Sequence, residues 1–215
     1  SLFRSYYSLD MRNFLLILSS FTFYLSADLK VSLDQELKTL MPKVIEWRHD
    51  IHEHPELGNR EFRTSNKVKV HLEGLGIKVE SGIAYTGVVG LIEGGKPGPT
   101  IALRADMDAL PVEEKTGLPF ASKVRTKYLG NDVGVMHACG HDAHVAILMG
   151  VAEFLAKNKS ELKGNVMLIF QPAEEGPPED EGGGAKMMLQ EGIFERYQPE
   201  VCLLYTSPSP RDGSI

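Results

Sequence analysis

The chain has 215 residues, with 23 Lys and Arg against 29 Asp and Glu and a formal net charge of −6. This length suits roughly one to two domains, and 42% hydrophobic with 24% charged residues excludes a disordered or fibrous protein. The acidic balance argues against nucleic-acid binding, and two cysteines, Cys139 and Cys202, cannot form a scaffold of several disulfides.

The N-terminal residues have the pattern of a secretory signal peptide. Met11-Arg12-Asn13 is a basic start, and residues 14–25 form an apolar run followed by small residues that end at Ala27. The run is shorter than the roughly 20 apolar residues that span a bilayer. We therefore expect residues 1–10 to be non-native upstream sequence and residues 11–27 to be the signal peptide. The alternative is a buried N-terminal helix or an uncleaved anchor.

A signal peptide would direct the protein to the secreted, periplasmic or endomembrane-lumenal space, with no membrane span after cleavage. Residues 28–204 are then expected to form one partial domain. The Ser- and Pro-rich stretch 205–215 follows a strand-like run directly and has no apolar period. It is expected to be a non-native tail, and a flexible native tail is the alternative.

Helices and strands alternate along residues 32–204. Apolar residues at helical spacing predict helices over 32–51, 61–75, 143–157 and 183–192. Apolar, β-rich runs predict strands over 77–79, 87–92, 100–105, 166–170 and 201–204. Asp142 is expected to cap the third helix, and the Gly- and Pro-rich residues 94–99 are expected to form a turn. The order predicts an α/β fold with a central mixed sheet flanked by helices.

Polar motifs occur at the ends of two predicted strands and before one predicted helix. Asp106-Met107-Asp108 follows the strand 100–105, and residues 171–176 follow the strand 166–170. The segment 137–144 carries three histidines and Cys139 directly before its helix. The carboxyl ends of strands in open α/β sheets lie at one edge, where ligands bind. We therefore expect these three motifs to meet at one site.

The triplet Cys139-Gly140-His141 suggests metal binding. The glycine lets the backbone bend so that sulfur and imidazole nitrogen face one centre, and both atoms bind zinc-like divalent ions. No Cys-x-x-Cys pair is present, so an open, carboxylate-rich site is favoured over structural zinc. For Cys139 alone, the alternative is a small buried hydrophobic residue.

Adjacent carboxylates at a strand end repel each other unless a cation is near. One of Glu174 and Glu175 can bind metal while the other transfers protons, as metal-assisted hydrolysis requires. The alternative is a solvated acidic loop, which is the expectation for residues 179–181. His52 lies at a helix end, where a hydrogen-bonded structural histidine is favoured over a site residue. No His-Glu-x-x-His is present, so zincin chemistry is not indicated.

Four ordered motifs carry a family resemblance. They are RHDIHEHPEL at 48–57, LRADMDALP at 103–111, HACGHDAH at 137–144 and QPAEEG at 171–176. Together they resemble the M20 metallopeptidase family, and most closely its amidohydrolase branch, which includes N-acyl-amino-acid amidohydrolases, hippurate hydrolases and auxin-conjugate hydrolases. The resemblance implies the N-terminal part of an M20-type catalytic domain, with the lid or dimerisation domain absent.

The resemblance also implies roles for individual residues. It implies that Cys139, His141 and Glu175 bind two divalent metal ions, manganese or zinc, and that Glu174 is the general base and acid. Asp108 matches a supporting acidic position near the metals. The implied reaction is hydrolysis of the amide bond of an N-acyl or N-aroyl amino acid by metal-activated water, in an enzyme that forms a homodimer at full length.

One departure from the family pattern concerns histidines. The family has a further histidine ligand soon after the strand 201–204 and another near the far C-terminus, whereas no histidine follows His144 and Thr206 stands near the first position. The chain alone is therefore expected to be inactive. The alternatives are a non-catalytic metal-binding fragment, an acid-rich binding module without metal, and an M20 dipeptidase or carboxypeptidase.

Overall fold

The structure is a computed structural model that describes residues 27–204, with side chains described from residue 35. The expected upstream residues, nearly all of the expected signal peptide and the expected tail lie outside the described residues. The chain divides into two compact units, residues 1–41 and 42–215. Residues 27–41 of helix α2 (Ala27–Glu53) are the described part of the first unit, where Leu37 and Met41 are exposed.

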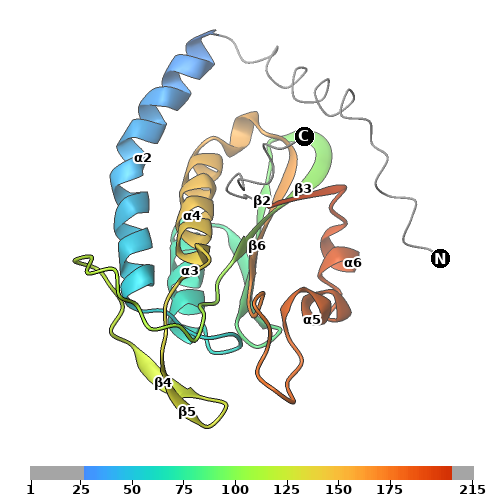
Figure 1. The fold of residues 1–215 in the computed structure, drawn as a ribbon. Coiled ribbons are helices and arrows are strands. Elements are labelled where there is room, and N and C mark those ends of the chain that lie inside the picture. The colour runs from blue at the N-terminus through green and yellow to red at the C-terminus, as the bar shows by residue number, and fades with distance from the viewer. Residues whose placement is uncertain (1–26, 205–215) are drawn as a thin grey trace, which may run out of the picture. The chain divides into compact units, whose positions relative to one another are not determined.

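The second unit is built on a five-stranded sheet of order β1-β2-β6-β3-β7 (Figure 1). The strands are β1 (Lys78–Ile83), β2 (Gly87–Glu93), β3 (Lys96–Asp106), β6 (Lys163–Gln171) and β7 (Val201–Leu204). The pairs β1–β2 and β2–β6 are antiparallel, whereas β6–β3 and β3–β7 are parallel. The predicted central mixed sheet is therefore confirmed.

Helices cover both faces of the sheet, as Figure 1 shows. They are α3 (Phe62–Gly74) and α4 (His141–Lys157) on one face, and α5 (Gly184–Gln190) and α6 (Ile193–Tyr197) on the other. Side chains of β6 alternate between the two layers: Leu168 and Phe170 pack with the first pair, and Met167 and Ile169 with the second. Burial on both faces explains the continuous apolar run in this strand.

Three further elements complete the described chain. They are the hairpin of β4 (Arg125–Tyr128) and β5 (Asn131–Gly134), which forms a separate two-stranded sheet, and the short 3-10 helix Lys159–Glu161. Neither this hairpin nor α6 was expected from the sequence. None of the helices in the described part of the chain combines the length and apolar character that a membrane crossing needs.

Two local predictions are wrong. Residues 94–99 are not a turn throughout, because β3 begins at Lys96 and pairs there with Lys163. A Cβ at Gly98 would lie 2.6 Å from the backbone nitrogen of Gly164, so this glycine permits close packing of two backbones. Asp142 does not cap α4, because Gly140 occupies the N-cap position with a φ of 107°.

Candidate active site

The three polar motifs meet at the carboxyl ends of β3 and β6. These strands are parallel neighbours, and Asp106 lies opposite Gln171 in the register. The backbone N–H of Met107 donates to the carbonyl oxygen of Gln171 at 2.9 Å, which keeps the two chains together beyond the strands. Helix α4 begins at the same place with His141. The predicted convergence is confirmed.

Three of the predicted site residues form a group that could hold a metal ion. One ligand atom from each of Cys139, His141 and Glu175 lies within 4.8 Å of the others. His141 is buried, whereas Cys139 and Glu175 reach solvent. A thiol, an imidazole and a carboxylate facing one point are a suitable donor set for zinc or a similar divalent ion.

The orientation of His141 also suits metal binding. Its Nδ1 lies 2.8 Å from the backbone carbonyl oxygen of Asp108, and because a carbonyl oxygen only accepts, Nδ1 carries the proton. Nε2 then faces the carboxylates, 3.6 Å from Glu174 Oε2 and 4.0 Å from Glu175 Oε1, where a bound metal ion would take the place of its proton. A metal-binding histidine is commonly oriented by such a bond from its other nitrogen.

Asp108 links the three motifs. Its side chain is buried, and its Oδ2 accepts the backbone N–H of Glu175 at 2.9 Å. Its Oδ1 lies 3.3 Å from Nδ1 of His141. The residue predicted as a supporting acid thus contacts two of the predicted ligands and holds the loop after β6 against the loop after β3.

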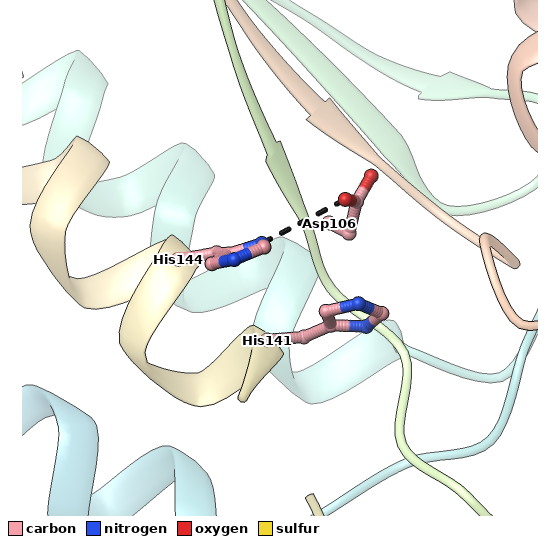
Figure 2. Close-up of side chains that lie close together, drawn as sticks. All are labelled: Asp106, His141 and His144. Carbon is pink, nitrogen blue, oxygen red and sulfur yellow. Dashed lines mark ion pairs between the residues drawn. The ribbon is translucent and has the colours of Figure 1, made fainter. Parts of the chain in front are cut away.

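A second group consists of Asp106, His141 and His144, whose ligand atoms also lie within 4.8 Å of one another. Figure 2 shows both imidazoles extending from α4 toward the end of β3, with His144 Nδ1 3.7 Å from Asp106 Oδ2. Neither Asp106 nor His144 was selected as a site residue from the sequence. The signal that would have found His144 is its spacing of three from His141, which places both on one face of the helix.

The pKa shifts show that negative charge accumulates here. Burial acts to lower the pKa of His141, but its hydrogen bonds to Asp108 and the nearby carboxylates raise it to about 9. Burial raises the pKa of the Cys139 thiol to about 11, with Glu175 and Glu174 adding to the effect. A divalent cation would reverse this, because a coordinating thiol loses its proton. The donor atoms and their charge therefore fit a divalent metal ion.

Glu174 lies beside this donor set but is partly open to solvent, with a side-chain exposure of 39%. Burial raises the pKa of its carboxyl, and the neighbouring carboxylate of Asp106 adds to the increase. A carboxyl with a raised pKa at the mouth of a site is suited to proton transfer near neutral pH.

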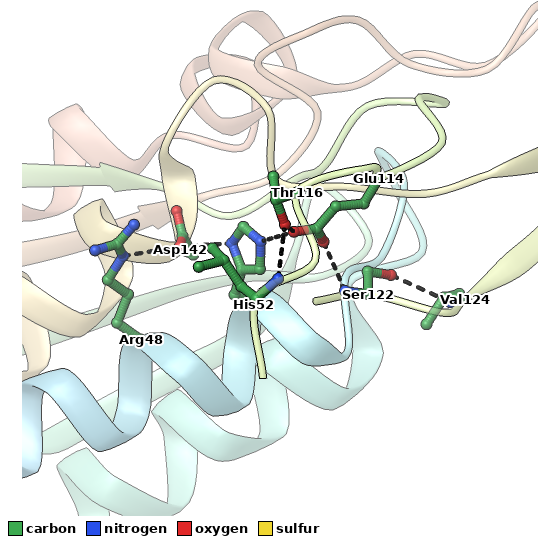
Figure 3. A network of polar contacts seen from close by, with 8 residues as sticks. Arg48, His52, Glu114, Thr116, Ser122, Val124 and Asp142 are labelled. Atoms are coloured by element: carbon green, nitrogen blue, oxygen red, sulfur yellow. Dashed lines mark hydrogen bonds and ion pairs between the residues drawn. The ribbon is translucent and has the colours of Figure 1, made fainter. Parts of the chain in front are cut away.

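A buried polar network anchors the start of α4 (Figure 3). His52 lies between two carboxylates, with Nδ1 3.0 Å from Asp142 Oδ2 and Nε2 3.2 Å from Glu114 Oε1. Arg48 adds a bond to Asp142 at 3.1 Å, and Glu114 accepts the backbone N–H of Ser122 at 2.6 Å. The prediction that His52 is a hydrogen-bonded structural histidine is confirmed. Asp142 lies inside the first turn of α4, and its carboxylate binds these tertiary partners.

The acidic run 179–181 is accessible to solvent, as expected, and its last residue is also paired. Glu181 accepts a bond from Arg60 Nη2 at 2.5 Å and another from Asn59 Nδ2 at 3.0 Å. The guanidinium and amide donors lower the pKa of this carboxyl. The loop that follows Glu174 and Glu175 is thus tied to the segment before α3.

Comparisons with known proteins find relatives that are similar to this chain in sequence and fold. Residues 102–215 match the peptidase family M20/M25/M40. Thermostable carboxypeptidase 1 of Saccharolobus solfataricus is 51% identical over 78% of this chain and 40% of its own length. N-acetyl-L-cysteine deacetylase of Bacillus subtilis is 46% identical over 83% of this chain and 40% of its own length.

Solved structures agree with the fold. A dinuclear metal binding peptidase from the M20 family of Bacillus subtilis has a TM-score of 0.68 and 41% identity, covering 80% of this chain and 44% of that one. The chain therefore spans less than half the length of this structure and of both curated relatives.

Proposed function

The chain belongs to the peptidase family M20/M25/M40, and on that premise we propose that the full-length protein is a metal-dependent hydrolase of amide bonds. The observation that carries the proposal is the meeting of Cys139, His141 and Glu175 at one point, with Glu174 beside them. Deacetylation and carboxypeptidase activity, which the names of the two relatives state, both break an amide bond.

We propose that Cys139, His141 and Glu175 hold divalent metal, two ions as in the dinuclear relative. Manganese and zinc are the candidates, because carboxylates accept the first and thiolate favours the second. Bound metal supplies Lewis-acid polarisation of the scissile carbonyl and a water of lowered pKa. The protein's contribution is to orient the donors, and Asp108 does so for His141 through its carbonyl oxygen.

Glu174 is proposed as the general base and acid. Its carboxylate takes a proton from the attacking water and then delivers that proton to the nitrogen of the leaving amine. The position supports this role, because Glu174 Oε2 lies 3.6 Å from His141 Nε2 while the side chain remains open to solvent. Its raised pKa brings proton transfer closer to neutral pH.

The substrate class is proposed to be N-acyl or N-aroyl amino acids. The deacetylase relative at 46% identity supports this class. A second candidate is a peptide with a free carboxyl terminus, and it is favoured by the carboxypeptidase relative at 51% identity. A panel of N-acetyl, N-benzoyl and dipeptide substrates, assayed with the full-length protein in manganese or zinc, separates the two classes.

The decisive variant is Glu174→Gln in the full-length protein. We expect hydrolysis to fall by about 100- to 10,000-fold, the usual contribution of a general acid–base residue, while metal content measured by elemental analysis stays the same. Glu179→Gln is the matched control, because it removes the same charge from an exposed position of the same loop and should leave activity unchanged. Full activity of Glu174→Gln would contradict the assigned role.

Three further proposals concern the whole protein: cleavage after Ala27 with export, a homodimer at full length, and inactivity of the 215-residue chain alone. The apolar run 14–25 supports export. N-terminal sequencing of the mature protein and sedimentation analysis test the first two. Metal titration of the 215-residue chain with an activity assay tests the third, and turnover would contradict it.

A further inference from the structure

A buried carboxylate lies directly behind the loop that carries Glu174 and Glu175. Glu61 is 0% exposed and stands at the N-cap position of α3, but its side chain makes no capping hydrogen bond to that helix. Instead Oε1 accepts the backbone N–H of Ala173 at 2.9 Å, and Oε2 accepts the hydroxyl of Thr86 at 2.5 Å. Burying a carboxylate costs free energy, so these partners call for an explanation beyond helix capping.

Ala173 has an unusual backbone conformation. Its φ is +47°, in the left-handed region that residues with a side chain rarely adopt, and it immediately precedes Glu174. Such a conformation persists only where surrounding contacts hold it. The hydrogen bond from its N–H to Oε1 of the Glu61 carboxyl group is one such contact.

Two buried carboxylates therefore hold the backbone on either side of Glu174. Glu61 accepts the N–H of Ala173 at 2.9 Å, and Asp108 accepts the N–H of Glu175 at 2.9 Å. Between these two fixed amides the backbone of Glu174 has little freedom to shift. The direction in which its side chain leaves the loop is set by these neighbours.

The segment before Glu61 supports the same loop. A Cβ at Gly58 would lie 2.8 Å from the carbonyl oxygen of Gly176, so only glycine allows the two backbones to approach this closely. The next residue, Asn59, donates from Nδ2 to the carbonyl oxygen of Gly182 at 2.9 Å. Residues 58–61 thus contact the loop near both of its ends, and Glu61 contacts it nearest to Glu174.

We propose that Glu61 is a positioning residue for hydrolysis, because its carboxylate holds Ala173 in the left-handed conformation and so places the Glu174 carboxylate beside His141. This inference rests on the proposed function. Glu61 acts through the backbone and does not touch substrate. Misplacing a catalytic group by about 1 Å lowers turnover by about 100-fold, with a smaller effect on substrate binding.

The test compares three variants in the full-length, metal-loaded protein. Glu61→Ala removes the acceptor, and we expect kcat to fall by about 10- to 100-fold with KM within about threefold and metal content unchanged. Glu61→Gln should restore kcat, because its Oε1 can accept the N–H of Ala173 while its amide donates to the Thr86 hydroxyl. Glu61→Asp keeps the carboxyl group but shortens the side chain, and it should lose kcat as Glu61→Ala does.

Val68→Ala is the matched control for stability. Val68 is fully buried on the same helix, so the substitution leaves a cavity in the α3 layer without removing a bond to residues 173–175. We expect it to lower the unfolding temperature but not kcat. An equal loss of kcat in Val68→Ala and Glu61→Ala would overturn the proposal, as would normal kcat in both Glu61→Ala and Glu61→Asp.

Hydrogen–deuterium exchange gives a readout that does not depend on activity. Glu61→Ala, or Glu61→Asp if the alanine variant does not fold, should speed exchange in a peptide covering 171–176, and Val68→Ala should not. Faster exchange in Glu61→Ala together with an inactive wild type would reject the proposed function. It would still show that Glu61 holds the backbone of residues 171–176. Unchanged exchange would overturn the positioning role, whatever the activity of the wild type.

Discussion

Charged side chains are buried at one end of the central sheet and exposed to solvent at the other. At the carboxyl ends of β3 and β6, the side chains of Asp106, Asp108 and His141 are each at most 2% exposed. At the other end, Lys96 and Glu161 form an ion pair at 2.6 Å with exposures of 46% and 68%. The same sheet thus carries a buried polar cluster at one end and solvated ion pairs at the other.

The charged residues at the two ends of the sheet are expected to contribute differently to stability. Exposed ion pairs are screened by water and contribute little to stability. Buried charges lose their hydration, and partners within the protein seldom restore all of that free energy. A sheet selected for stability alone would have both ends like that of Lys96 and Glu161. The buried carboxylates at the site end are therefore consistent with a role in the proposed hydrolysis.

The largest effect is expected from Asp108→Ala. The substitution removes the acceptor of the Glu175 N–H and leaves the buried His141 without its carboxylate. Breaking a buried pair costs about 3–5 kcal/mol, which urea unfolding of the metal-free, full-length protein would measure. A loss below about 1 kcal/mol, the usual effect of an exposed pair, would show that the two ends do not differ.

A pH-dependent effect is expected at Glu61. Burial raises the pKa of its carboxyl to about 7, although bonds from Thr86 and the Ala173 N–H act in the opposite direction. The carboxylate of Asp108 adds to the rise, and Arg60 is the nearby cation. The folded state keeps this proton up to about pH 7, whereas the unfolded chain releases it near 4.5. The stability contributed by this group is therefore complete below pH 4.5 and is lost as the pH rises through 7.

Glu61→Gln has no such proton, so it isolates the effect. Its free energy of unfolding relative to wild type should increase between about pH 4.5 and pH 7, by on the order of 2–3 kcal/mol. Urea unfolding of both proteins across this range provides the measurement. If the difference in free energy of unfolding between Glu61→Gln and wild type did not vary with pH, burial would not raise the pKa of the Glu61 carboxyl.

A smaller effect is expected from His52→Leu. The variant removes one partner from each of two carboxylates, Asp142 and Glu114. Each keeps other partners, so the cost should be about 1–3 kcal/mol, seen as a lower thermal unfolding midpoint. A midpoint equal to that of wild type would mean that the network in Figure 3 does not stabilise the start of α4.

The smallest effect is expected at the opposite end of the sheet. Glu161→Ala removes an exposed partner of Lys96, and we expect no measurable change in the thermal unfolding midpoint or in hydrolysis. This variant is also the reference for the other substitutions. If it destabilised the protein as much as His52→Leu does, exposure would not account for the contrast between the two ends.

Much of the fold follows from local patterns. The apolar run of β6 and the helical spacing of α4 were sufficient to predict both elements, and the parallel-strand rule correctly predicted that Asp108, His141 and Glu175 would meet. These predictions succeed because hydrophobic periodicity and strand direction are properties of short segments.

Other features depend on tertiary contacts that no local rule contains. The capping rule predicted a local role for Asp142. Instead, Arg48 and His52, which lie on a helix far away in the sequence, bind its carboxylate. Glu61 looks like an ordinary acidic residue at a helix start, and its bond to Ala173 joins positions 112 residues apart. Such contacts form only when the sheet and helices pack, so the sequence alone could not reveal them.

The proposed function requires that Cys139 bind a divalent cation at the carboxyl end of the sheet. Cobalt(II) titration of the full-length protein tests it, because a thiolate ligand produces a charge-transfer band in the near ultraviolet. Cys202→Ser is the matched control, since Cys202 is also a free thiol but lies on β7. We predict that the band appears in wild type and in Cys202→Ser and is lost in Cys139→Ser. A band that persists in Cys139→Ser would contradict this role of Cys139.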